Sequence, residues 1–236
     1  MTAPALDVDQ LAPADRALWE AMGEATPTYT PTPTPGARHE LAACDALGVM
    51  LGTPLTPWER WTCRVFTERR LDDPGRYRFP LALLTVPRQA GKTTVVRIIL
   101  VVRMIMFPSR RCFYTAQTGK DASQRWADLV DLIKRPASPL ASLVKVRRAA
   151  GSAALTIEPT GSRLSPFAPT PESLHGYTPH DVALDELFAF DDTEGDALLG
   201  AVLPAQQTIR ARQLLMLSTA GDRTSTFLRR MVTTGR

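Results

Sequence analysis

A chain of 236 residues, 44% of them apolar and 22% charged, is long enough to form one α/β domain with its own hydrophobic core. Its cysteines, Cys44, Cys63 and Cys112, are scattered and form no Cys-x-x-Cys pair, so neither a disulfide framework nor a zinc site is expected. No apolar segment is long enough to cross a bilayer, and the first residues lack the apolar centre of a signal sequence. We therefore expect a soluble protein of the cell interior, without a membrane partner.

The net charge of +4 is unevenly distributed along the chain. Residues 1–40 contain six acidic and two basic side chains, so the remaining residues carry 26 basic against 18 acidic ones. Most of the cations are arginines, whose planar guanidinium group can bind two phosphate oxygens at once. The charge is compatible with a nucleic-acid partner, and equally with an arginine-rich surface that is only solvated.

Residues 1–37 are expected to form an acidic extension before the main domain. Apolar residues recur at helical spacing between Leu11 and Met22. Residues 26–36 are rich in proline and threonine, a composition that excludes helix and sheet. We expect this segment to be a linker rather than a strap on the surface, and we place the domain boundary there, with the main domain at residues 38–225.

A helix is expected at about residues 57–70, with Thr56 as its N-cap. It carries Trp58 and Trp61 in its first turns. On the simpler interpretation both rings pack in the core. The alternative is a platform for a purine ring, with Glu59 as a nearby polar group.

The segment that organises the chain is an apolar run, a polar loop and a second apolar run. Residues 81–86 favour a strand and residues 95–107 favour a helix. The loop between them reads Pro87-Arg88-Gln89-Ala90-Gly91-Lys92-Thr93-Thr94. A buried strand that leads through Gly-Lys-Thr into a helix is typical of a phosphate-binding loop, so we expect residues 87–94 to bind a nucleotide.

Each residue type in this loop has a chemical reason. Gly91 lets the backbone pass close to a polyphosphate. Lys92 would reach the β- and γ-phosphates, and the Thr93 hydroxyl would bind Mg²⁺. The usual pattern begins with a glycine at the position of Val86, so the match is degenerate.

A second strand at residues 111–117 and a helix at about 122–134 follow the phosphate loop. Strands that alternate with helices predict a mainly parallel sheet with helices on both faces, and ligand groups beyond the carboxyl ends of the strands. Residues 136–170 differ, because short apolar runs separated by glycine and proline predict short antiparallel strands. The expected fold is therefore a three-layer α/β domain with a short antiparallel β insertion.

A second chemical feature is the short apolar strand at residues 181–184, which ends in Asp185 and Glu186. In the functional interpretation Asp185 holds Mg²⁺ through its water shell, and Glu186 orients and polarises the water that attacks the γ-phosphate. In the alternative interpretation the two acids only cap the next helix. The phosphate loop earlier in the chain favours catalysis.

A last strand at residues 213–217 ends in Ser218-Thr219-Ala220-Gly221. These small residues either form a turn, or their hydroxyls hydrogen-bond the γ-phosphate or its water and so sense hydrolysis. The following arginines predict a basic tail, and residues 226–236 are expected to begin a basic linker.

Taken in order, five segments resemble the ATPase domain of the large terminase subunit of tailed double-stranded DNA phages. The similarity covers about residues 50–225. The segments are Leu55-Thr56-Pro57-Trp58-Glu59, the phosphate loop, Thr115-Ala116-Gln117-Thr118, Leu184-Asp185-Glu186 and Ser218-Thr219-Ala220-Gly221. Five segments in the right order are far more specific than any one of them.

The resemblance implies a RecA-like P-loop NTPase fold and Mg²⁺-dependent ATP hydrolysis that drives double-stranded DNA into the prohead. It implies adenine contacts from Trp58 and Glu59, a contact of Arg88 with the γ-phosphate or catalytic water, and a coupling motif at residues 218–221. Its implied partners are double-stranded DNA, the portal protein and the small terminase subunit. The implied assembly is a homo-oligomeric ring in the host cytoplasm, transiently at the portal vertex of the prohead.

The chain departs from the family pattern at two places. Glu59 stands where the family has glutamine, which leaves adenine selectivity open. His175-Gly176 stands where many relatives carry an arginine that reaches the neighbouring subunit's nucleotide, and Arg163 is our candidate substitute. The family's second half is a metal-dependent nuclease, and the chain ends before it, so we expect no DNA cleavage.

Three other functions share part of this pattern. A superfamily 2 helicase or related nucleic-acid-stimulated ATPase has the phosphate loop and the Asp-Glu pair, but requires a second RecA-like domain. A nucleotide-gated assembly module would bind ATP without hydrolysing it. A small-molecule kinase is the weakest alternative, because nothing in the sequence resembles an acceptor-binding lid.

Overall fold

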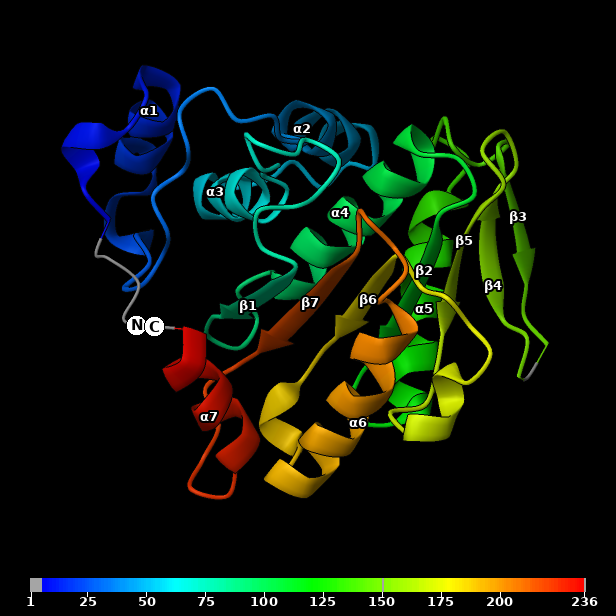
Figure 1. Ribbon diagram of the computed structural model, residues 1–236. Coiled ribbons are helices and arrows are strands. Elements are labelled where there is room, and N and C mark those ends of the chain that lie inside the picture. The colour runs from blue at the N-terminus through cyan, green and yellow to red at the C-terminus, as the bar shows by residue number, and fades with distance from the viewer. Residues whose placement is uncertain (1–5, 150, 236) are drawn as a thin grey trace.

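The computed structural model describes residues 6–149 and 151–235 (Figure 1). Its centre is a seven-stranded sheet with the order β1-β7-β6-β2-β5-β4-β3. The strands are β1 (Leu81–Thr85), β2 (Arg111–Thr115), β3 (Val144–Arg147), β4 (Ala154–Ile157), β5 (Ser162–Pro166), β6 (Asp181–Leu184) and β7 (Gln213–Ser218). The first five in spatial order are parallel and the last two antiparallel, which confirms the mainly parallel sheet expected from the sequence.

Helices cover both faces of this sheet, so the three-layer arrangement is also confirmed. They are α1 (Pro13–Met22), α2 (Leu41–Met50), α3 (Pro57–Phe66), α4 (Lys92–Met106), α5 (Gly119–Ile133), α6 (Asp192–Ala205) and α7 (Thr226–Gly235). Ala183 of β6 packs in the core shared with α2, α4 and α5, and its neighbour Val182 packs in the core shared with α6 and α7. Successive side chains of a strand point to opposite faces, so one apolar strand serves both cores.

The carboxyl ends of the parallel strands gather the polar segments of the sequence at one edge of the sheet. Thr85 of β1 pairs with Ser218 of β7, and Thr115 of β2 pairs with Leu184 of β6. The segments that follow these four strands therefore lie side by side.

The antiparallel strands are part of the main sheet. β3 pairs antiparallel with β4, and β4 pairs antiparallel with β5, as the short antiparallel strands expected here. β5 also pairs in parallel with β2, with Arg163 opposite Arg111. The insertion is thus an extension of the central sheet beyond β2.

The structure differs from the expectations at several element boundaries, most of all at the end of α3 and after residue 225. Helix α3 ends at Phe66, about one turn before the expected end, because Arg69 leaves the helix to form a bridge with Tyr77. Residues 226–235, expected to begin a linker, form helix α7. Phe227 of this helix is fully buried, and its ring lies where Gly195 of α6 has no side chain.

The acidic extension lies as a strap against α3. Arg64 of α3 forms a buried ion pair of 2.8 Å with Asp15 of α1. The Trp61 indole N–H donates a 3.0 Å hydrogen bond to the Thr30 hydroxyl. Residues 26–36 therefore have defined contacts with the main domain, as a strap rather than the expected linker.

A buried ion-pair network lies at the amino ends of β6 and β7. Arg103 donates hydrogen bonds to Asp181 at 2.7 Å, to Gln213 at 2.7 Å and to Glu40 at 3.1 Å. Arg110 also binds Asp181. Burial alone would raise the pKa of Asp181, but the guanidinium groups of Arg110 and Arg103 outweigh it and hold that pKa below its ordinary value.

Among the described residues, no helix is both long enough and apolar enough to cross a membrane.

Candidate nucleotide-hydrolysis site

The phosphate loop occupies the connection from β1 to α4. Gln89 and Gly91 adopt left-handed backbone conformations, with φ of 61° and 105°. α4 begins at Lys92, directly after the turn. The first amides of a helix have no partner within it, so this terminus offers N–H donors and a positive dipole end to an anion.

Lys92, Thr93 and Asp185 meet at this edge, as the sequence predicted. The ammonium group of Lys92 lies 2.8 Å from Oδ1 of Asp185, and the Thr93 hydroxyl lies 3.4 Å from Oδ2. The carboxylate is only 1% exposed. A cation from the phosphate loop therefore pairs with the buried carboxylate across two neighbouring elements.

Tyr114 is a member of the site that the sequence analysis did not single out. Its hydroxyl donates a 2.8 Å hydrogen bond to Oδ2 of Asp185. Burial raises the pKa of Tyr114, and the nearby Asp185 raises it further, so the phenol keeps its proton and acts as a donor. Its place in an apolar strand gave no functional signal, because such a residue is usually part of the core.

Glu186 follows Asp185 in a left-handed conformation with φ of 62°. Its backbone N–H donates to Oδ1 of Asp185 at 2.8 Å, and its carboxylate lies 3.8 Å from the guanidinium of Arg125. Non-glycine residues held in this conformation are strained and concentrate at functional sites. Glu186 precedes the short 3-10 helix Leu187–Ala189 without making a side-chain capping bond, so the capping interpretation does not account for it.

Glu59 and Trp58 contact the phosphate loop. A Cβ atom added to Gly91 would lie 2.4 Å from Oε1 of Glu59 and 3.5 Å from the Trp58 ring. Glu59 also accepts two hydrogen bonds from Thr56, from the backbone N–H at 2.8 Å and the hydroxyl at 2.7 Å. Trp61 is instead buried and packs edge-to-face on the ring of Trp19. The packing interpretation is thus confirmed for Trp61. Trp58 is partly buried and also packs against the apolar core, and together with Glu59 it borders the loop.

The motif Ser218-Thr219-Ala220-Gly221 joins the phosphate loop to the segment after Glu186. The carbonyl of Ser218 accepts a 3.2 Å hydrogen bond from Val86, and its hydroxyl accepts one of 3.0 Å from the Phe188 backbone. The Thr219 hydroxyl is buried and, within the described chain, has no hydrogen-bond partner. A buried unpaired hydroxyl is costly, so this group suits a ligand or ordered water.

Gly221 is closely packed against the start of α7. A Cβ atom there would lie 2.2 Å from the Ser225 hydroxyl. That hydroxyl donates to the Phe188 carbonyl at 2.7 Å. Phe188 therefore contacts both the end of β7 and the segment that begins α7.

The two arginines singled out by the sequence lie at different places. The guanidinium of Arg88 lies 5.9 Å from the centre of the Phe188 ring, at the same end of the sheet as the rest of the phosphate loop. Arg163 lies at the amino end of β5, opposite Arg111, and so at the other edge of the sheet. The structure does not bring Arg163 to this nucleotide site, and a role in a neighbouring subunit's site stays a prediction.

The donor groups fit a magnesium ion held partly by a nucleotide. Asp185 and Thr93 supply protein oxygens within 3.4 Å of each other. Within the described chain, no group of three or more His, Cys, Asp or Glu side chains could hold a metal by itself. Mg²⁺ commonly keeps several waters and binds one or two protein oxygens together with substrate phosphates, which matches this pair.

A strand, a phosphate loop at a helix N-terminus and an Asp-Glu pair after a second parallel strand, with the aspartate buried, define a P-loop NTPase. The family model for the ATPase domain of the terminase large subunit matches residues 61–231. The chain therefore belongs to the terminase large subunit ATPase family.

Solved structures show the same fold. The large terminase of bacteriophage HK97 is similar with a TM-score of 0.66 and 18% sequence identity, over 84% of this chain and 41% of that one. The large terminase ATPase domain of Thermus phage P74-26 is similar with a TM-score of 0.54 and 16% identity, over 77% of this chain and 71% of that one. The chain thus spans less than half of the HK97 protein. No curated protein matches it.

Proposed function

We propose that this chain is a Mg²⁺-dependent ATPase that drives double-stranded DNA into a phage prohead. The observation that carries the proposal is the meeting of Lys92, Thr93 and Asp185 within 2.8 to 3.4 Å, with Glu186 next to them in a left-handed conformation. Family membership supports the ATPase part. The large-terminase fold supports the choice of DNA as the partner.

Each residue has a role in this proposal. Lys92 exchanges its bond to Asp185 for the β- and γ-phosphates when ATP binds, and the α4 N-terminus receives the phosphate oxygens. Thr93 and Asp185 would hold Mg²⁺, which when bound would neutralise charge on the phosphate oxygens. Tyr114 keeps its hydrogen bond and orients the Asp185 carboxylate.

Glu186 orients the attacking water and takes up its proton, as a general base must. Arg88, in the same loop, is placed to contact the γ-phosphate or that water. The Ser218 and Thr219 hydroxyls respond to the loss of the γ-phosphate. The hydrogen bonds that Ser218 accepts, at its carbonyl from Val86 and at its hydroxyl from Phe188, would pass the change from the phosphate loop toward α7.

The assembly is also a proposal. We propose that the active form is a homo-oligomeric ring that engages the portal protein, the small terminase subunit and double-stranded DNA. It acts in the host cytoplasm and transiently at the portal vertex. Arg163, exposed at the sheet edge away from its own nucleotide site, is the candidate that reaches a neighbouring nucleotide in such a ring. We also expect no DNA cleavage by this chain, which incubation of supercoiled plasmid with Mg²⁺ or Mn²⁺ tests.

The experiment that tests the ATPase is phosphate release from ATP and Mg²⁺ over a wide range of protein concentration, with and without duplex DNA. The Glu186→Gln chain is the blank. Turnover per subunit that rises with concentration supports a ring with a trans-acting arginine, and Arg163→Ala should then abolish the rise. Constant turnover supports a self-sufficient site. Tight ATP binding without phosphate release would reject the proposal in favour of a nucleotide-gated assembly module.

A further inference from the structure

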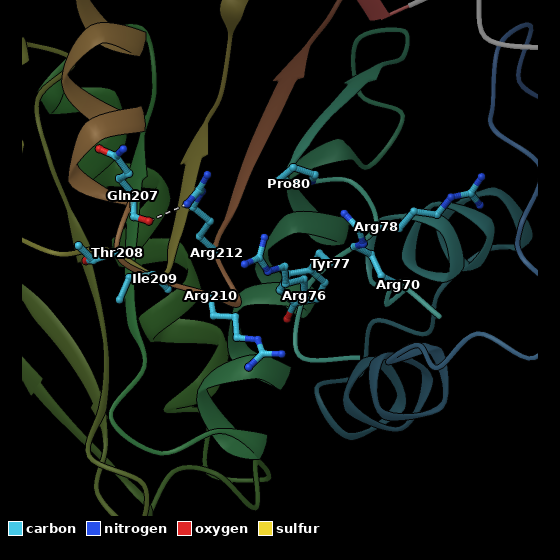
Figure 2. Close-up of a pocket in the computed structure, with 10 residues that line it drawn as sticks. All are labelled: Arg70, Arg76, Tyr77, Arg78, Pro80, Gln207, Thr208, Ile209, Arg210 and Arg212. Carbon is cyan, nitrogen blue, oxygen red and sulfur yellow. Dashed lines mark hydrogen bonds between the residues drawn. The ribbon is translucent and has the colours of Figure 1, made fainter. Parts of the chain in front are cut away.

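A second concave site lies at the amino ends of β1 and β7, on the sheet edge opposite the phosphate loop. It has a volume of about 300 Å³. Figure 2 shows that its side chains come from two segments, residues 70–80 before β1 and residues 207–212 before β7. Five of them are arginines, and we call this site the arginine pocket: Arg70, Arg76, Arg78, Arg210 and Arg212.

In the first half of the pocket, arginines from the two segments outnumber the carboxylates that pair with them. Asp73 pairs with both Arg76, at 3.1 Å, and Arg210, at 2.7 Å. Arg212 donates to the backbone carbonyl of Gln207 at 2.9 Å (Figure 2), and no carboxylate among the described residues pairs with it. This half of the pocket therefore has three guanidinium groups and one acid.

The other half is balanced. Arg70 pairs with Asp72 at the surface. Arg78 pairs with Glu68 at 2.7 Å, and Glu68 also accepts a 2.7 Å hydrogen bond from the buried Arg64, whose second acidic partner is Asp15. The excess of positive charge therefore lies in the half that carries Arg76, Arg210 and Arg212.

The floor of the pocket does not cancel this charge. Tyr77 forms part of the floor, is 2% exposed and donates a 2.9 Å hydrogen bond to Glu40. Beneath it lies the buried ion-pair network, whose three cations face two carboxylates: Arg69, Arg103, Arg110, Glu40 and Asp181. The potential in the pocket is therefore positive from the rim to the floor.

We propose that the arginine pocket binds phosphate groups, and that these are the backbone phosphates of a nucleic acid. Arginine suits this ligand because its fork binds two phosphate oxygens at once. The side chains of Arg76 and Arg210 are 57% and 69% exposed, so they can reach a strand that passes over the pocket. The site is separate from the phosphate loop. The proposal rests on the proposed function only for the choice of DNA over a free polyphosphate.

The test compares DNA binding by the intact chain and two charge-matched variants, without ATP. The pocket variant carries Arg210→Gln and Arg212→Gln. The control carries Arg147→Gln and Arg148→Gln, which remove the same charge from the exposed end of β3 and the loop that follows it. Fluorescence anisotropy of a short labelled duplex is measured over a range of KCl concentrations.

We expect the pocket variant to bind DNA about tenfold more weakly than the parent chain, with a shallower dependence of log K on log salt by about two, because two phosphate contacts are lost. The control should retain the salt dependence of the parent chain. Equal weakening by both double variants would overturn the proposal, because it would show a general charge effect. Unchanged DNA binding by the pocket variant would overturn the choice of DNA.

A titration with tripolyphosphate tests whether the pocket binds a free polyphosphate rather than DNA. It is titrated calorimetrically into the Lys92→Ala chain, whose phosphate loop lacks its lysine, with and without the two pocket substitutions. Binding that the pocket substitutions abolish, while DNA binding is unaffected, would assign the pocket to free polyphosphate. No effect on either ligand would refute a phosphate site. All readouts are binding, so a chain without ATP turnover would reject the ATPase and leave this result intact.

Discussion

The Tyr114 hydroxyl donates a 2.8 Å hydrogen bond to Oδ2 of Asp185, while Lys92 holds Oδ1 of the same carboxylate at 2.8 Å. We expect ATP binding to affect these two partners of Asp185 differently. Lys92 is expected to turn to the phosphates, whereas Tyr114 is fixed in β2 and buried. We therefore expect the tyrosine to keep the carboxylate oriented while Lys92 binds the phosphates.

Tyr114→Phe should raise the Mg²⁺ concentration needed for half-maximal ATP hydrolysis by about tenfold, because groups that orient a metal ligand contribute on this scale. It should also lower the free energy of unfolding by about 1 kcal/mol, the usual contribution of one hydrogen bond. Mg²⁺ titrations and urea unfolding measure the two effects. Tyr177→Phe, at a half-exposed ring, is the control. An unchanged Mg²⁺ requirement would show that the tyrosine has only a packing role.

Lys92→Ala and Glu186→Gln should separate binding from chemistry. Lys92→Ala removes the cation for the β- and γ-phosphates and should abolish nucleotide binding. Glu186→Gln keeps the shape of the site but cannot take up a proton, so binding should persist while turnover falls by roughly 10² or more. Calorimetry and phosphate release check the pair. Turnover of Glu186→Gln at the parent rate would remove Glu186 from the catalytic role.

Gly91→Ala should disrupt the phosphate loop for two reasons. The residue has φ of 105°, and a Cβ atom would lie 2.4 Å from the Glu59 carboxylate. We expect a loss of about 2 kcal/mol in the free energy of unfolding, and no nucleotide binding. Gly161→Ala is the matched control, because its φ is 65° but no atom lies within 4 Å of the added Cβ. An equal loss in both variants would show that only backbone strain matters at Gly91.

Asp181→Asn should change how the free energy of unfolding depends on pH, because Asp181 belongs to the buried ion-pair network. The pKa of Asp181 lies below its ordinary value of 3.8 in the folded protein. Its contribution to stability is therefore complete above that value and is lost as pH falls through the folded pKa. The variant should be less stable by about 3 to 5 kcal/mol at pH 7 and should lose less stability below pH about 4.

Urea unfolding at several pH values measures this effect. Asp131→Asn, which breaks an exposed ion pair with Arg148, is the control and should change the free energy of unfolding by about 1 kcal/mol or less. Equal losses in the two variants would contradict a special contribution from the buried network.

The sequence by itself determined the strands and the chemistry at their ends. Lys92 and Asp185 are 93 positions apart, yet each follows an apolar run that could only be a buried strand. Parallel strands place their carboxyl ends at one edge, so the meeting of these residues could be predicted from local pattern alone.

Only the tertiary structure determined which elements contact one another, because the order of the strands in the sheet cannot be read from local sequence. Tyr114 reaches Asp185 because β2 lies beside β6, and the arginine pocket forms because β1 lies beside β7. Helix α7 is stable because Gly195 leaves room for Phe227. Such contacts join segments 30 to more than 100 positions apart, and they depend on strand order and on packing, which no local periodicity encodes.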